Sequence, residues 1–216
     1  MSTAICRRAA GRFIVLEGID GSGTTTQGQA LVAAFERAGL RAHFTHEPSS
    51  LPIGLLLRQV LTSGPELERP DWDAMALLFA ADRLQHVSAE IEPLLARGVT
   101  VISDRYDLSS LAYQSATAPD GASVLPWLRA INQRARRPDV TLVFDVEPAV
   151  AEARRAQRGG RPELFERREL QARLASIYTR AAELVPGDAI VHLDANGALP
   201  EVEANVMAAL ARAFPV

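Results

Sequence analysis

The chain has 216 residues and a formal net charge of −3, and 48% of its residues are hydrophobic. This length suits one α/β domain, and the charge gives no general reason to bind nucleic acid polymers or anionic membranes. A single cysteine, Cys6, excludes an internal disulfide framework. The apolar stretch 75–81 is too short to span a bilayer, so we expect a cytoplasmic protein. All 23 basic residues are arginine, and lysine is absent.

The first predicted element is a buried strand over residues 12–17, followed by a glycine-rich turn and a helix over residues 25–38. Residues 18–25 fit the phosphate-binding loop G-x-x-x-x-G-K-[ST] everywhere except at the lysine, where this chain has Thr24. Strand, loop and helix in this order are the context that the loop requires. The chemistry of an incomplete phosphate loop is therefore the central functional question.

Strands and helices alternate along the rest of the chain, with a turn at Glu47-Pro48. This alternation predicts an α/β fold, with a five-stranded parallel sheet covered by helices on both faces and ligands at the carboxyl ends of the strands. The later strands are predicted over residues 41–46, 99–103, 140–146 and 189–193. The later helices are predicted over residues 54–61, 72–97 with an interruption near Pro93, from 108, from 124, 149–157, 163–184 and 200–213.

The glycine-rich loop predicts a site for nucleotide phosphates, because its backbone N–H groups curl around phosphate oxygens at a helix N-terminus. Thr25 would place its hydroxyl on Mg²⁺, which arrives with ATP. Thr24 cannot replace the charge of the missing lysine. The other possible interpretation is a turn that merely links strand to helix. The expected phosphate contacts are Gly18, Gly21, Ser22, Gly23, Thr24, Thr25 and Thr26.

Two further motifs carry charged side chains. Asp104-Arg105-Tyr106 follows an apolar strand, and the fork of Arg105 suits a phosphate. A surface ion pair that caps the next helix explains this tripeptide equally well. Phe79 and Arg83 are four residues apart on a predicted helix, so that they can reach one ligand together, although an apolar Phe on a helix is more often a core residue.

Together these motifs resemble those of the thymidylate kinases, and the resemblance extends from one end of the chain to the other. It implies a three-layer P-loop NTPase fold with a short lid, formed as a single kinase domain by residues 1–216. It also implies ATP and Mg²⁺ as cofactors and a homodimer as the assembly. The matching segments are residues 16–23, 46–48, 78–83, 104–106, 109–114, 138–145 and 194–195.

The resemblance implies specific roles in binding dTMP. Asp20 would contact the sugar 3′-hydroxyl, Phe79 would stack on thymine, and Arg105 would bind the acceptor phosphate. Asp104 would help to organise Mg²⁺ and phosphate. The complete set of implied dTMP contacts is Asp20, Glu47, Pro48, Arg58, Phe79, Arg83, Arg105, Tyr106, Ser110, Tyr113 and Gln114.

The chain departs from the family pattern at Thr24, at Ser49-Ser50 in place of two glycines, and at residues 115–118. Four arginines surround the Gly159-Gly160 pair, in a region over residues 154–166 that resembles the mobile lid of the family. One of these arginines is expected to replace part of the missing charge, although a solvated helix face is the alternative. The four are Arg154, Arg155, Arg158 and Arg161, and the predicted catalytic set is Thr24, Asp104, Arg105, Arg158 and Arg161.

Three functional hypotheses follow from this sequence. The first is an active thymidylate kinase that transfers the γ-phosphoryl group of ATP to dTMP. The second is a weakened or inactive nucleotide-binding homologue, which only Thr24 supports directly. The third is a kinase for another nucleoside monophosphate. The four histidines show no metal-binding spacing and are interpreted as surface or satisfied core residues.

Overall fold

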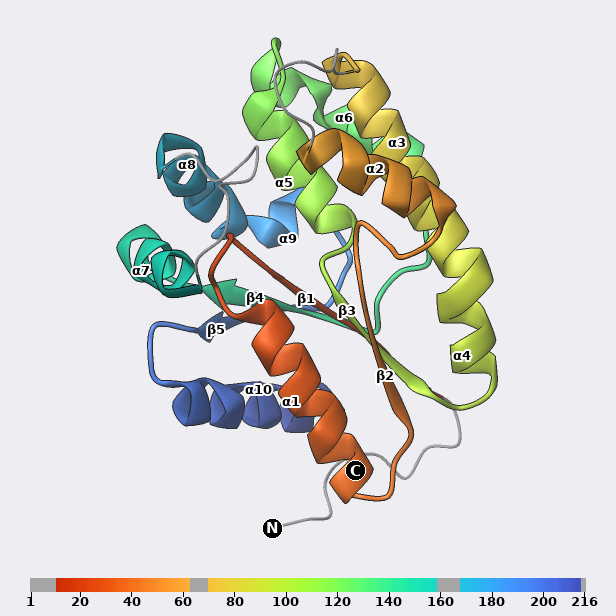
Figure 1. The fold of residues 1–216 in the computed structure, drawn as a ribbon, viewed down its shortest axis with the longest axis vertical. Helices are drawn as coiled ribbons and strands as arrows, with labels where there is room; N and C mark the ends of the chain where they lie inside the picture. The colour runs from red at the N-terminus through yellow and green to blue at the C-terminus, as the bar shows by residue number, and fades with distance from the viewer. Residues whose placement is uncertain (1–10, 63–69, 159–167, 215–216) are drawn as a thin grey trace.

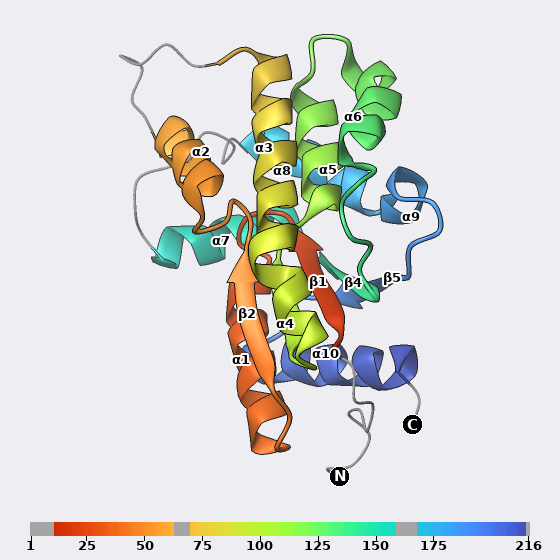
Figure 2. The same cartoon turned by 90° about the vertical axis from the view of Figure 1, so that its right-hand side faces the viewer.

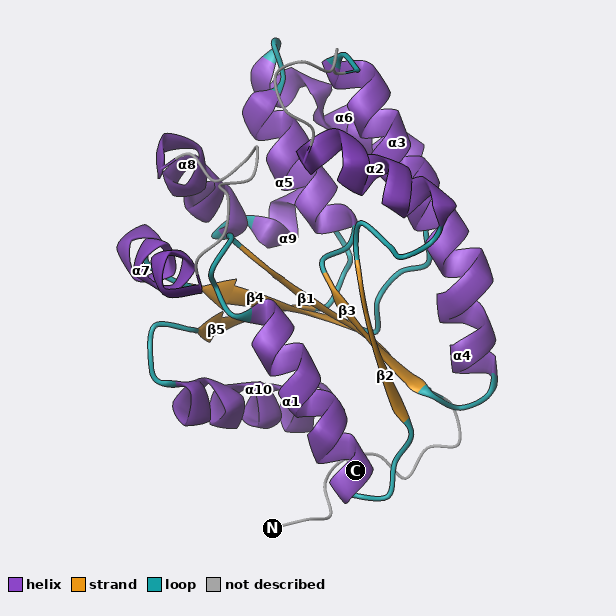
Figure 3. Cartoon of the chain, viewed as in Figure 1, coloured by secondary structure: helices purple, strands orange, loops and turns teal. Residues whose placement is uncertain are grey.

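The computed structural model describes residues 11–62, 70–158 and 168–214. In these residues five parallel strands form one sheet in the order β2-β3-β1-β4-β5. Helices cover both faces of this sheet (Figure 1, Figure 3), which confirms the predicted three-layer α/β fold. The strands are β1 (Phe13–Gly18), β2 (Ala42–His46), β3 (Thr100–Asp104), β4 (Val140–Asp145) and β5 (Ile190–Asp194).

The central strand β1 explains where ligands can bind. All six of its residues are buried, because its side chains alternate between a larger hydrophobic cluster that contains Ile14 and Leu16 and a smaller one that contains Phe13 and Val15. Strand β3 lies on one side of β1 and β4 on the other, so the order of strands reverses at β1. In parallel sheets ligands bind at such a reversal, outside the carboxyl ends of the strands.

The helices divide between the two faces of the sheet. Helices α1 and α10 cover one face, whereas α5, α8 and α9 lie on the other, with α3 and α6 packed outside them (Figure 1). Within the described residues, none of the helices combines the length and apolar character needed to cross a bilayer. The helices are α1 (Thr24–Arg37), α2 (Pro52–Thr62), α3 (Trp72–His86), α4 (Glu92–Ala96), α5 (Asp107–Thr117), α6 (Leu125–Asn132), α7 (Pro148–Arg158), α8 (Arg168–Tyr178), α9 (Ala181–Leu184) and α10 (Leu199–Ala213).

The long helix predicted over residues 72–97 is interrupted, as expected. A π-helical turn, Val87–Ile91, separates α3 from α4, and Pro93 lies just after it. Proline has no backbone N–H and its ring crowds the preceding turn, which accounts for a defect at this place. Figure 2 shows α3 and α4 as one nearly continuous column beside β2.

The prediction of a single helix over residues 163–184 is wrong. Residues 163–167 lie outside the described part of the chain, and the remainder forms two helices, α8 and α9, with a break at Thr179 and Arg180. Tyr178 and Ala181 are both buried. Both pack into the same hydrophobic cluster, and the sequence periodicity gives no sign of the break between them.

Candidate active site

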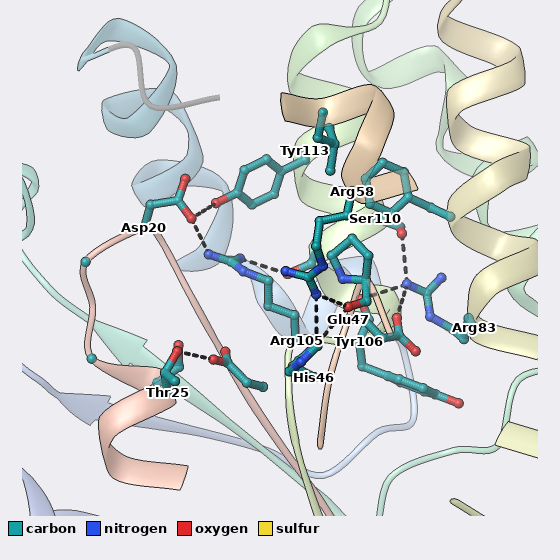
Figure 4. A pocket seen from close by; sticks show the side chains of 18 of the residues that line it. Asp20, Thr25, His46, Glu47, Arg58, Arg83, Arg105, Tyr106, Ser110 and Tyr113 are labelled. Carbon is teal, nitrogen blue, oxygen red and sulfur yellow. Dashed lines mark hydrogen bonds and ion pairs between the residues drawn. The ribbon is translucent and has the colours of Figure 1, made fainter. Parts of the chain in front are cut away.

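A cavity of about 690 Å³ opens at the carboxyl ends of β1, β2 and β3 (Figure 4). This volume falls within the usual range for ligand pockets. The phosphate loop, the turn after β2, helices α2, α3 and α5, the turn after β3 and helix α7 all contribute to it. The predicted site residues that line it are Asp20, Gly21, Gly23, Thr24, Thr25, Thr26, Glu47, Pro48, Arg58, Phe79, Arg83, Asp104, Arg105, Tyr106, Ser110, Tyr113 and Gln114.

A few predicted residues do not line the cavity. Gly18 and Ser22 lie beneath the loop, where the Ser22 side chain is buried against Gly18 and supports the loop from below. Arg158 ends α7, but its side chain is not among the described parts, and Arg161 lies outside the described residues. The cavity is also lined by Arg154 and Arg155, two of the four arginines predicted as candidates to replace the missing charge. His46, Leu61 and Ser109 line it as well and were not predicted as site residues.

The phosphate loop has the backbone that its motif requires. Gly21 and Gly23 have φ angles of 90° and 98°, which are rarely adopted by residues with a side chain. Gly23 caps α1 without a side-chain hydrogen bond, so the first N–H groups of α1 are open toward the cavity. An anion at this point gains from those donors and from the helix dipole. Thr24 follows directly and adds no charge.

Thr25 and Asp104 face each other across the cavity floor. The Thr25 hydroxyl donates a hydrogen bond to Asp104 Oδ2 (Figure 4). Asp104 Oδ1 is buried and has no hydrogen-bond partner among the described residues. Hydroxyl and carboxylate oxygens are the ligands that Mg²⁺ prefers, so this pair fits a magnesium ion that also binds phosphate oxygens.

Arg105 lies at the centre of the cavity and is held from several sides. Its Nη2 is 2.5 Å from Asp20 Oδ1, and its Nη1 donates to the carbonyl of Gly18 at 3.0 Å. The guanidinium lies 5.1 Å from the ring centroid of Tyr113. Burial alone lowers the pKa of Arg105, but Tyr113, Asp20, Tyr178 and Asp104 together outweigh it and raise that pKa well above its usual value. Arg105 is therefore a fixed positive charge.

Asp20 is in turn fixed by its neighbours. Its Oδ1 accepts a hydrogen bond from the Tyr113 hydroxyl at 3.1 Å, and its Oδ2 accepts one from Gln171 Nε2 at 2.8 Å. Gln171 Oε1 accepts from the backbone N–H of Asp20 at 3.0 Å. Residue 171 belongs to α8, so a helix more than a hundred residues away orients the carboxylate. No local sequence pattern indicated this contact.

Arg83 forms a second buried cation, with 1% of its surface exposed. Its Nη2 lies 2.7 Å from Glu47 Oε2 and 3.0 Å from Ser110 Oγ, and its Nη1 donates to Asn132. Burial lowers the pKa of Arg83, but Glu47, Asp107 and Tyr106 together outweigh it and the net shift is upward. The Tyr106 ring lies below the guanidinium, with 5.2 Å between them, and supports it from the core.

The outer wall of the cavity comes from Phe79, Gln114 and Arg58. Phe79 is half-buried on α3, one turn before Arg83, so the two side chains share the cavity as their spacing predicted. Arg58 is exposed on α2, and its Nη2 donates to the carbonyl of Pro48 at 2.6 Å. This carbonyl follows a cis peptide bond between Glu47 and Pro48.

Helix α7 brings two arginines to the phosphate loop. Arg155 donates to the carbonyl of Asp20, and a Cβ added at Gly21 would lie 3.1 Å from Arg155 Cγ. Arg154 donates to the carbonyl of Gly197 at 2.9 Å and lies 3.4 Å from that of Ser22. The partners that the structure describes for these two guanidinium groups are all carbonyl oxygens, so no described carboxylate neutralises them.

Comparisons with known proteins agree with this geometry. The family model described as thymidylate kinase matches residues 16–206. The chain is 38% identical over 200 residues to a probable thymidylate kinase of Pyrococcus horikoshii, covering 92% of this chain and 95% of that protein. It is 41% identical over 195 residues to a probable thymidylate kinase of Pyrobaculum aerophilum, covering 90% and 93%. It is 40% identical over 205 residues to a thymidylate kinase of Xanthomonas campestris, covering 93% and 85%. The chain therefore belongs to the thymidylate kinase family, and it is a nucleoside monophosphate kinase.

Proposed function

We propose that this protein transfers the γ-phosphoryl group of ATP to dTMP, which yields ADP and dTDP. The observation that supports this most directly is the single cavity that joins the phosphate loop to the Arg83 and Arg105 sites. Phosphoryl transfer is catalysed mainly by positioning two nucleotides and by stabilising the charge between them. A noncatalytic nucleotide-binding protein is not favoured, because the chain belongs to a family of kinases.

On the donor side, the phosphates of ATP would bind the N–H groups of the loop between Gly18 and Thr26. Thr25 and Asp104 would hold Mg²⁺ through their oxygens. The ion, when bound, supplies positive charge at the phosphate oxygens. Asp104 also accepts the Thr25 hydrogen bond, which orients both side chains toward the phosphates.

On the acceptor side, Arg105 would bind the phosphate of dTMP and Phe79 would stack on the thymine ring. Three observations support this: the guanidinium of Arg105 is fixed, Phe79 lines the same cavity, and Tyr113 packs against Arg105. Asp20 would meet the sugar hydroxyl. The edge of thymine would meet the remaining polar groups of this wall, which are Arg58, Arg83, Ser110 and Gln114.

The charge missing at Thr24 would be supplied from α7. Arg154 and Arg155 line the cavity, and the structure describes only carbonyl oxygens as their partners. Such a guanidinium keeps its full charge for a phosphate, whereas Arg83 and Arg105 are each paired with a carboxylate. We favour Arg155, because its guanidinium donates to a carbonyl of the loop itself, that of Asp20. A lid over residues 154–166, including Arg158 and Arg161, stays part of this proposal.

We also propose one kinase domain over residues 1–216, assembled as a homodimer in the cytoplasm. The single sheet and its shared core support one domain. Exposed leucines on two neighbouring helices, α2 and α3, support a contact with a second copy. Light scattering on the purified chain tests the assembly, and a monomer at assay concentrations would contradict it. These leucines are Leu55, Leu56, Leu77 and Leu84.

The decisive experiment measures ADP formed by the purified chain with MgATP, in the presence and absence of dTMP. We expect dTMP-dependent turnover within the kinase range of about 1–100 per second, reduced if α7 replaces the lysine only in part. Competition of dTMP with dUMP, dGMP and UMP then tests the acceptor. ADP formation that does not depend on dTMP, or dTMP binding without turnover, would contradict the proposal.

A further inference from the structure

A buried carboxyl group lies behind the acceptor site. Glu17, on β1, has 0% of its surface exposed. It accepts hydrogen bonds from the backbone N–H groups of Tyr106 at 2.8 Å and Ser109 at 3.1 Å. The Ser109 hydroxyl donates to it at 2.5 Å and the Tyr178 hydroxyl at 3.0 Å. The fold therefore provides four hydrogen-bond donors for this carboxyl group, whose burial without them would be strongly unfavourable.

These donors connect Glu17 to Arg105. Ser109 Oγ, which donates to Glu17, accepts a hydrogen bond from Arg105 Nη1 at 3.1 Å. Tyr106, whose N–H donates to Glu17, is the next residue after Arg105. Glu17 therefore restrains the backbone on the carboxyl side of Arg105 and, through Ser109, the guanidinium itself.

The backbone of Arg105 needs such a restraint. Its φ angle is 71°, and no other non-glycine residue in the described ranges has a positive φ. A residue with a side chain rarely adopts this conformation, so the surroundings must impose it. Strand β1 does so at two points, since Leu16 accepts from the N–H of Arg105 at 2.8 Å and Glu17 accepts from the next N–H.

From this geometry we propose that Glu17 is a positioning residue that holds Arg105 in the orientation that receives the acceptor phosphate. The inference rests on the proposed function of Arg105. Glu17 lies behind Arg105, with Ser109 between them, so it acts through Arg105 and does not touch the substrate. Its ionised form accepts all four donors, whereas its protonated form must donate one hydrogen bond itself and then disturbs Ser109.

The ionisation of Glu17 falls in the working range of pH. Burial raises the pKa of Glu17 to about 7, and the Ser109 hydrogen bond and the charge of Arg105 oppose this rise. The binding of the acceptor phosphate by Arg105 would therefore weaken as the pH falls below about 7. The charged and titratable groups around Glu17 are Arg105 and Tyr106 after β3, Tyr178 on α8, and, beyond Arg105, Asp20 and Tyr113.

The test compares the pH dependence of kcat/KM for dTMP in the wild type, Glu17→Gln and Tyr178→Phe, from about pH 5 to 9. In Glu17→Gln we expect the KM for dTMP to rise about tenfold or more with little change for ATP, and the acidic limb due to Glu17 to disappear. The second ionisation of dTMP, near pH 6, stays in every profile and serves as an internal reference.

Tyr178→Phe keeps the carboxyl and removes one donor. Loss of that donor raises the pKa of Glu17, so the acidic limb should move up by about one pH unit. If Glu17→Gln does not fold, Tyr178→Phe still tests the role of Glu17. Glu183→Gln, at an exposed position near the same helix, serves as a control and should match the wild type.

Two results would overturn the role of Glu17: a folded Glu17→Gln enzyme with unchanged KM and pH profile, or a Tyr178→Phe profile that does not move. Failure of the proposed function is a separate outcome, since it would show as a wild type without dTMP-dependent ADP. In that event the affinity for dTMP, measured by calorimetry against pH in the same variants, still tests Glu17.

Discussion

The acceptor side and the donor side of the cavity hold their positive charges in different ways. Arg83 and Arg105 each form an ion pair with a carboxylate, Glu47 and Asp20, and Arg83 is almost completely buried. On the donor side, the partners that the structure describes for Arg154 and Arg155 of α7 are all carbonyl oxygens. Charges on the acceptor side are thus built into the core, whereas those on the donor side rest on one helix. The difference predicts that acceptor-side changes affect folding and donor-side changes affect rate.

The largest effect is expected for Arg83→Met. Glu47 would remain buried without its main partner, and breaking such a pair destabilises proteins by about 3–5 kcal/mol. His86 Nδ1 lies 3.2 Å from Glu47, so we expect the lower end of this range. Urea unfolding measures the change. As a control, Arg180→Met breaks an exposed ion pair and should leave the midpoint of urea unfolding unchanged. A similarly small effect of Arg83→Met would refute the proposed difference between the acceptor side and the donor side.

The second-largest effect is expected in the free energy of unfolding, which should depend on pH because of Glu17. Its pKa is raised to about 7 in the folded protein, against 4.5 for an exposed carboxyl. The protonated form of Glu17 stabilises the folded protein. This contribution to the free energy of unfolding is complete below pH 4.5 and is lost as the pH rises through 7. This loss amounts to about 3 kcal/mol. Urea unfolding at about pH 5 and 8 should show most of this loss in the wild type and none of it in Glu17→Gln. Parallel curves for the two proteins would contradict it.

On the donor side, Arg155→Gln should lower turnover without unfolding the protein. Removing one preorganised charge from a developing negative charge typically costs about 10²-fold or more in rate. Steady-state ADP production with saturating dTMP measures this, and thermal unfolding should change little. Arg129→Gln is a matched control, because within the described residues Arg129 also donates to carbonyl oxygens alone, but it lies away from the cavity. Equal rates for Arg155→Gln, Arg154→Gln and the wild type would exclude Arg154 and Arg155 as the source of the charge.

The smallest effect is expected at a helix start outside both regions. Asp71 caps α3, and its Oδ1 accepts from the N–H of Ala74 at 2.8 Å. Asp71→Ala should lower stability by about 1 kcal/mol and leave the KM for both nucleotides unchanged. A large change in KM for dTMP would mean that α3 couples folding to the acceptor site more strongly than the ion pair at Arg83 implies.

Much of the fold and of the cavity follows from local patterns. Apolar runs that end in a glycine-rich loop or in Asp104-Arg105 mark the carboxyl ends of β1 and β3, and parallel pairing brings those ends together. The spacing of Phe79 and Arg83 on one helix likewise anticipated their shared place in the cavity. Such signals lie within a few residues of each other, which is why a sequence can reveal them.

The remaining features depend on contacts between distant segments. Nothing near Glu17 indicates that Tyr178 donates to it, or that Gln171 orients Asp20. The break between α8 and α9 likewise has no local signal, since Tyr178 and Ala181 on its two sides pack into the same hydrophobic cluster. Buried polar partners are matched by the tertiary structure, and periodicity carries no information about them.

The central place of β1 also has a consequence for how the protein is made. Its partners are β3, where Phe13 pairs with Val101, and β4, where Ile14 pairs with Val140. A nascent chain that has reached Ala118 contains the complete phosphate loop but lacks one neighbour of the strand that holds it. Such long-range pairing is slow, and its apolar strand waits several seconds for synthesis to supply β4. The capacity to bind nucleotide thus arises late in translation, and until then β1 is an apolar strand with one edge unpaired.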